Sequence, residues 1–242
     1  MVEIRKLIRL ASILAIIASL LVIGHRIYLK YQIKAVNDSV ARRADELIEA
    51  NYKEKTDYKK LIEDIRTDIG NDSVIAKLTF DKLDINLLIV ESEDDEYWLS
   101  HDLNEEYSIA GTLFLDRYNN SDFKDYNSTI YGHNMLDGSM FASLKKLLNQ
   151  DFVDNGEANT FTLLTQTGEF TYDVIAVRVL YPSRDDYIVN YDKDWIKEMK
   201  DNSSVILSDP TKNTKDDNYV TLSTCNHAEG DDRVVVVGKM RK

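Results

Sequence analysis

The single cysteine of the chain, Cys225, is the residue whose type and setting offer the clearest chemistry. It ends a β-type run, YVTLSTC, and a polar loop of seven residues separates it from the next run, RVVVVGKM, which begins at Arg233. Two successive runs joined by a short loop predict an antiparallel pair that brings Cys225 and Arg233 together. A permanently charged guanidinium favours a thiolate and can hold a developing oxyanion. The pattern indicates a thiol nucleophile, with an inert buried thiol or an intermolecular disulfide as alternatives.

A cysteine nucleophile also needs a group that donates and accepts protons, and the chain has four histidines. His133 follows a β-type run at a strand-to-loop boundary, where catalytic side chains are often presented. His227 lies two residues after Cys225 in the polar loop and is the rival candidate, whereas His101 is in an acidic stretch and His25 is near the apolar N-terminal segment. The plain alternatives are a turn histidine at 133 and a surface ion pair of Arg233 with a neighbouring aspartate.

These residues lie in motifs that resemble those of a known enzyme family. TLSTC, followed eight residues later by RVVVVGK, resembles the TLxTC…R signature of sortases, and YGHNMLDGSMF (131–141) resembles the histidine segment of class B sortases. The resemblance covers about residues 36–242. It implies a mainly β fold, the eight-stranded sortase-type β-barrel with N-terminal helices and a helix between late strands, preceded by one transmembrane helix. It also implies a cysteine transpeptidase of the thiol protease class that anchors secreted proteins to the wall of a Gram-positive bacterium.

The resemblance assigns roles to the three catalytic candidates. Cys225 attacks the Thr carbonyl of a C-terminal sorting motif to form an acyl-thioester, and Arg233 holds the oxyanion or aligns the substrate. His133, expected to face Cys225 across the barrel, protonates the leaving amine and then takes a proton from a peptidoglycan amine. The implied partners are secreted proteins with NPQTN-like or PPxTG-like motifs, and no cofactor or metal is expected.

The sorting peptide needs binding residues as well. By the resemblance, Ser223 contacts this peptide, because it lies on the same side of the strand as Cys225. Tyr187 and Leu99 are further candidates, for which ordinary surface or core packing is the alternative. Asn134 is expected to orient the imidazole beside it, although turn chemistry explains this residue equally well.

The elements that must position these residues are mostly short β-type runs from Ser73 onward, which favour a sandwich or closed barrel. Residues 36–69 are spaced for a helix that ends at Gly70, and 139–150 and 192–201 are expected to be helical. The expected strands lie at 74–80, 85–90, 108–116, 128–133, 161–181 with a hairpin at Thr167 and Gly168, 204–209, 218–225 and 233–240.

The N-terminal segment predicts a membrane anchor. Residues 10–24 carry no charge, and Leu7 and Ile8 extend the apolar run behind Arg5 and Lys6. An uncleaved signal anchor in the cell membrane follows, single-pass, with its N-terminus cytoplasmic and the catalytic domain extracellular; a cleaved signal peptide is the alternative. The expected organisation is a cytoplasmic N-terminus at 1–6, a transmembrane helix at 7–27, a helical stalk at 28–72 and the catalytic barrel at 73–242.

Composition and residue order exclude several other functions. A net charge of −12 argues against nucleic-acid binding, which needs a clustered basic face. An L,D-transpeptidase would have Arg two residues after the cysteine, where His227 stands, and a papain-like hydrolase would have its cysteine before its histidine. The remaining alternative is a non-catalytic, membrane-anchored β-barrel that binds a wall ligand.

Overall fold

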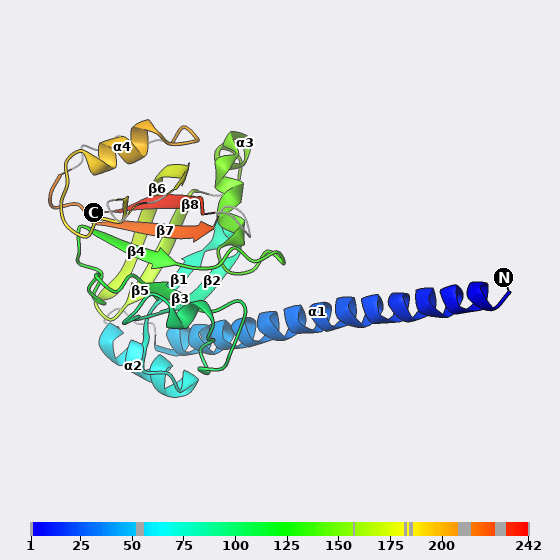
Figure 1. The fold of residues 1–242 in the computed structure, drawn as a ribbon. Helices are drawn as coiled ribbons and strands as arrows, with labels where there is room; N and C mark the ends of the chain where they lie inside the picture. Colours follow the sequence, from blue (N-terminus) through cyan, green and yellow to red (C-terminus); the bar gives the residue numbers. More distant parts are fainter. Residues whose placement is uncertain are drawn as a thin grey trace. The chain divides into compact units, whose positions relative to one another are not determined.

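The predicted barrel is present in the computed structural model of the chain (Figure 1). Eight strands close in the order β1-β2-β3-β4-β7-β8-β6-β5, and most neighbours are antiparallel, but β2 pairs with β3 and β4 pairs with β7 in parallel. The structure describes residues 2–51, 56–156, 158–181, 183, 186–207, 214–225 and 231–241. The strands are β1 (Val74–Phe80), β2 (Ile85–Val90), β3 (Leu113–Leu115), β4 (Asn127–Tyr131), β5 (Thr160–Thr165), β6 (Gly168–Leu180), β7 (Tyr219–Cys225) and β8 (Arg233–Met240).

The N-terminal part of the chain is helical. Helix α1 (Val2–Asn51) runs through the expected limit at 27–28 without a break. Its apolar stretch has a mean hydropathy of 2.5, and among the described residues it is the one helix long and apolar enough to cross a membrane. The chain divides into two compact units after Ser39, so the last residues of α1 belong to the unit that holds the barrel.

The C-terminal end of α1 is tied to the barrel unit by packing and charge. Val40 and Ala44 are buried there. The carboxylate of Asp45 lies 2.7 Å from Nζ of Lys77 on β1, and it also accepts a hydrogen bond from Asn86 of β2. The Lys77 side chain is only 6% exposed, so it depends on this partner to compensate for its lost hydration. The second helix, α2 (Tyr58–Ile69), ends at Gly70, as predicted, because Gly70 takes a left-handed conformation.

Four expected elements differ from the structure. The helix expected over 36–69 is two helices, α1 and α2, because Thr56 and Asp57 are not helical and Asp57 caps the start of α2. Within 108–116 only β3 is a strand, because Ser108 to Gly111 form a turn in which the Gly111 amide donates to the Ser108 carbonyl. The described part of 204–209, residues 204–207, is not a strand, and its Ser204 amide donates to the Val177 carbonyl of β6 at 2.6 Å. Within 139–150, where one helix was expected, a 3-10 helix (Ala142–Leu148) carries the apolar residues, and the short helix α3 (Gln150–Asp154) follows it.

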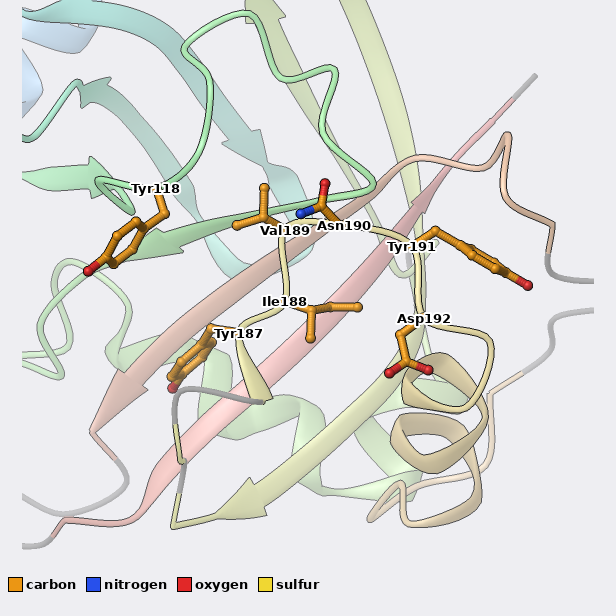
Figure 2. A pocket seen from close by; sticks show the side chains of 7 residues that line it. All are labelled: Tyr118, Tyr187, Ile188, Val189, Asn190, Tyr191 and Asp192. Atoms are coloured by element: carbon orange, nitrogen blue, oxygen red, sulfur yellow. The ribbon is translucent and has the colours of Figure 1, made fainter.

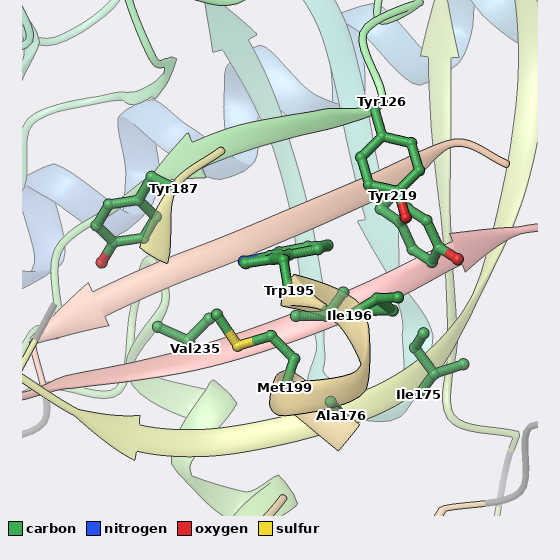
Figure 3. Packing of buried hydrophobic residues seen from close by; sticks show 10 residues of the cluster. Tyr126, Ile175, Ala176, Tyr187, Trp195, Ile196, Met199, Tyr219 and Val235 are labelled. Atoms are coloured by element: carbon green, nitrogen blue, oxygen red, sulfur yellow. The ribbon is translucent and has the colours of Figure 1, made fainter. Parts of the chain in front are cut away.

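The predicted helix between two late strands is α4 (Trp195–Asp201), and it covers one outer face of the barrel. Its buried side chains Trp195, Ile196 and Met199 pack on Tyr219 of β7 and on residues of β6 and β8 (Figure 3). Because side chains alternate along a strand, Ser223 shares the face of Tyr219. The segment around α4 therefore covers the face of β7 that carries Ser223.

Candidate active site

The three residues expected to be catalytic lie at one edge of three neighbouring strands. On β7 and β8, Cys225 is directly opposite Arg233, as the antiparallel pairing predicts. On β4 and β7, Tyr131 is opposite Ser223 in a parallel register, and the Gly132 amide continues the pairing by donating to the Ser223 carbonyl at 3.2 Å. His133 and Cys225 each follow this last pair of residues by two positions, His133 after Tyr131 and Cys225 after Ser223. His133 thus approaches from the adjacent strand, and the expectation that it faces Cys225 across the barrel was wrong.

His133 is half-buried and is held on two sides. Its backbone carbonyl accepts a hydrogen bond from the Phe141 amide at 2.9 Å, and its Nε2 lies 2.8 Å from the backbone carbonyl oxygen of Leu99. A carbonyl oxygen can only accept, so Nε2 carries the proton in this contact. Gly132 makes the placement possible, since a Cβ at this position would overlap the side chains of Leu113 and Phe141.

A tight turn presents the Leu99 carbonyl to His133. The 3-10 helix Tyr97–Leu99 begins after Asp94, whose carboxylate accepts hydrogen bonds from the amides of Tyr97 and Glu96. These two amides hold the pKa of Asp94 below its ordinary value, with Tyr97 contributing most. The ring of His101 stacks on that of Tyr97, with centroids 4.0 Å apart, so His101 helps to build this turn.

The guanidinium of Arg233 is oriented by backbone oxygens next to it. Its Nη1 donates to the carbonyl of Asp231 at 3.0 Å and to that of Asp232 at 3.4 Å. Arg233 is only partly exposed, at the first position of β8. A permanently charged group is therefore held at the strand end that faces Cys225.

Two of the three expected substrate-binding residues contact each other. The hydroxyl groups of Tyr187 and Ser223 are 2.8 Å apart, and both residues are buried. This hydrogen bond joins the segment after β6 to β7, two residues before Cys225. Leu99 is 38% exposed, and it meets His133 through its carbonyl group.

A pocket of about 570 Å³ opens beside Tyr187 (Figure 2). The segment 187–192 forms most of its lining, and Tyr118 comes from the loop after β3. This volume is typical of small-molecule or side-chain binding sites, about 300–1,000 Å³. Tyr187 lines the pocket and is also hydrogen-bonded to Ser223 of β7, so the pocket adjoins the face of β7 that carries Ser223.

A buried aspartate and a partly buried tyrosine support the strand that precedes His133. The hydroxyl group of Tyr131 donates to the Asp116 carboxylate at 2.8 Å, and its ring packs edge-on against that of Tyr187. Burial raises the pKa of Tyr131, and the negative charge of Asp116 adds to the shift. Tyr131 therefore stays neutral and keeps donating to Asp116, which fixes the end of β4.

The remaining candidates have smaller structural roles or cannot be placed. Asn134 forms an isolated bridge with Met140, in keeping with the turn alternative for this residue. His227 lies outside the described residues. Across the described part of the chain, no group of three or more histidine, cysteine, aspartate or glutamate side chains is arranged to hold a metal ion.

Sequence reasoning missed the importance of Gly111. Its φ is +58°, and a Cβ added there would overlap the carbonyl oxygen of Trp98 and would lie 2.8 Å from that of Leu99. An isolated glycine inside a strand-like run is a known sign of close backbone approach, so the run 108–116 did contain the signal.

Comparison with known proteins relates this geometry to one enzyme family. The model of the sortase domain matches residues 78–241. Sortase B of Listeria monocytogenes is 32% identical over 180 residues, which cover 70% of each chain. Among solved structures, sortase B from B. anthracis in complex with AAEK1 aligns with a TM-score of 0.74 and 25% identity over 88% of this chain and 98% of that one. A Staphylococcus aureus sortase B–substrate complex aligns with a TM-score of 0.77 at 20% identity over the same shares, which is a likeness of fold.

Proposed function

The chain belongs to the sortase family, class B, and is a cysteine transpeptidase that anchors proteins to the cell wall; we propose that Cys225, His133 and Arg233 carry out this reaction. The observation that supports this assignment best is the shared strand edge. The register of β4 and β7 ends at Tyr131 and Ser223, two residues before His133 and Cys225, and the register of β7 and β8 pairs Cys225 with Arg233. Membership of an enzyme family does not favour the alternative of a non-catalytic binding barrel.

The proposed reaction has two balanced halves. The Cys225 thiolate forms a bond to the Thr carbonyl carbon of the sorting motif, and Arg233 stabilises the oxygen that becomes negative. The peptide C–N bond then breaks, protonated His133 gives its proton to the leaving amine, and an acyl-thioester remains. A wall amine attacks the thioester, loses a proton to His133 and takes the acyl group, which frees the thiolate.

One similar solved structure is a Staphylococcus aureus sortase B–substrate complex. We propose NPQTN-like or PPxTG-like motifs of secreted proteins as the substrates here and an amine of peptidoglycan as the acceptor. The pocket along 187–192 has the size to receive side chains of such a peptide. Ser223, Tyr187 and the exposed part of Leu99 are proposed to contact it.

The position of the enzyme in the cell is part of the proposal. We propose that residues 7–27 of α1 form a single-pass signal anchor in the membrane of a Gram-positive bacterium, after a cytoplasmic N-terminus at 1–6. A helical stalk at 28–72 would then lead to an extracellular catalytic barrel at 73–242. The apolar composition of α1 supports the anchor, and the basic residues Arg5 and Lys6 support the orientation.

The test is to trap the acyl-enzyme on the full-length chain in detergent. The protein is incubated with a panel of sorting peptides, and the thioester is measured by mass spectrometry before and after an amine is added. The wild type should gain the mass of the acyl fragment and lose it to the amine. Cys225→Ala should gain none, and this small change at a strand end should lower stability only modestly.

A second comparison decides between the histidines. His133→Gln should stop turnover, whereas His227→Gln and His101→Gln should retain most of it. If His227→Gln is inactive and His133→Gln is active, the acid–base assignment is wrong. Peptide turnover that persists in Cys225→Ala would refute the assignment of the nucleophile.

A further inference from the structure

We propose that the backbone carbonyl of Leu99 fixes the tautomer of His133, so that Nδ1 alone exchanges the proton during catalysis, and that Gly111 is the positioning residue that makes this contact possible. The inference rests on the proposed role of His133 as the acid–base group. It assigns to Leu99 a function through its backbone, in addition to any contact of its side chain with substrate.

The hydrogen bond from His133 to the Leu99 carbonyl determines which ring nitrogen of His133 can exchange a proton. Nε2 of His133 lies 2.8 Å from the Leu99 oxygen, and this oxygen has no proton to give. Nε2 therefore stays protonated in the neutral ring and in the imidazolium. Since a neutral imidazole carries one proton, Nδ1 is then the acceptor, and protonation of the ring adds the second proton at Nδ1.

The Leu99 carbonyl is held in place from both sides of its turn. The Asp94 carboxylate binds the amides at the start of the turn, and the Thr112 amide donates to the neighbouring Trp98 carbonyl at 2.9 Å. The Thr112 hydroxyl group donates to the His101 carbonyl at 2.9 Å. Hydrogen bonds to residues 94 and 112 thus hold the turn on both sides of the Leu99 carbonyl. The Leu99 oxygen is therefore an acceptor with a fixed position.

Gly111 lies directly behind this peptide. A Cβ at position 111 would be 2.8 Å from the Leu99 oxygen, 2.9 Å from the Leu99 carbonyl carbon and in overlap with the Trp98 oxygen. These neighbours are backbone atoms, so they cannot swing aside as a side chain would. Any residue other than glycine must push the Leu99 carbonyl away from its present position relative to His133.

The experiment reads the tautomer directly. The full-length chain, labelled with ¹⁵N-histidine and held in detergent, is studied by long-range ¹H–¹⁵N correlation over a series of pH values, and the tautomer is assigned from the spectra of the neutral ring. His133→Gln identifies the signals of His133 among the four histidines. The expected wild-type pattern is that of the Nε2–H tautomer.

Gly111→Ala and Gly70→Ala form the matched pair of variants. Gly70 also has a left-handed backbone, with φ of +82°, but a Cβ there would meet nothing within 4 Å. Gly111→Ala should convert part of His133 to the other tautomer and lower turnover by about 10²-fold, as small misplacements of catalytic groups do. Gly70→Ala should leave the tautomer and turnover unchanged.

Three results would overturn the inference. One is an Nδ1–H tautomer in the wild type. This measurement needs no glycine variant, so it tests the inference even if Gly111→Ala fails to fold. Another is a folded Gly111→Ala with the wild-type tautomer and rate. The third is an equal loss in both glycine variants. An active His133→Gln would instead refute the proposed function, so the two failures are distinguishable.

Discussion

The hydrogen bond between Tyr187 and Ser223 predicts a measurable coupling between the segment after β6 and the strand that carries Cys225. The two hydroxyl oxygens are 2.8 Å apart, Tyr187 is 9% exposed and Ser223 is 1% exposed. Tyr187→Phe and Ser223→Ala each remove one partner and leave the other hydroxyl group buried. The double variant removes both partners.

The magnitude follows from the cost of an unpaired buried group. Tyr187→Phe should lose about 1–3 kcal/mol of unfolding free energy, because the Ser223 hydroxyl group that remains is only 1% exposed and is cut off from water. Ser223→Ala should lose about 1 kcal/mol, the usual net contribution of one hydrogen bond. The double variant has no such group, so its loss should be smaller than the sum of the single losses. A coupling energy of about 1 kcal/mol is expected.

The assay is urea unfolding of the wild type and the three variants, with peptide turnover measured beside it. The midpoints give the coupling energy, provided that the slopes agree. Turnover should fall in both single variants, because the bond orders Tyr187, which lines the pocket, and Ser223, which lies two residues before Cys225. Additive losses of stability would show that the two hydroxyl groups do not interact in solution, and the structural reasoning for this part of the site would fail.

Three further predictions follow from other parts of the site and its support. Arg233→Lys keeps the positive charge but loses the planar pair of hydrogen-bond donors, and turnover should drop by about 10²–10³-fold. An unchanged rate would mean that Arg233 acts only through its long-range charge. A chain without residues 1–35 should be soluble, monomeric by size-exclusion chromatography and active, whereas removal of 1–51 should lower the unfolding midpoint, because it deletes the carboxylate partner of buried Lys77. Asp94→Ala should be less stable than the wild type at pH 7, and the difference should shrink as the pH falls below 3.8. The pKa of this carboxylate is depressed from 3.8 in the folded state, so its contribution is complete above that value and is lost as the folded carboxylate becomes protonated at lower pH. Urea midpoints at pH 7 and pH 3 test this, and a constant difference would contradict it.

The local elements of the barrel were largely readable from the sequence. The runs 74–80, 85–90 and 233–240 coincide with β1, β2 and β8, because β-branched and apolar residues favour buried strands and turn residues end them. The hairpin at Thr167 and Gly168 was also correct. Elements whose type depends on tertiary packing could not be predicted from the sequence. The run 108–116 has a strand-like composition, but a turn at Gly111 limits the strand to three residues.

The pairing of Cys225 with Arg233 could be predicted from sequence alone, because two strands joined by a short loop have few alternatives to an antiparallel register. The position of His133 could not, because β4 and β7 are far apart in the chain and pair in parallel, and nothing local specifies which strands become neighbours when a barrel closes. The carbonyl of Leu99 is hidden from sequence reasoning for a deeper reason. Every residue has a backbone carbonyl, so its side-chain type says nothing of this role, and only the folded turn between Asp94 and Thr112 directs that oxygen at the imidazole.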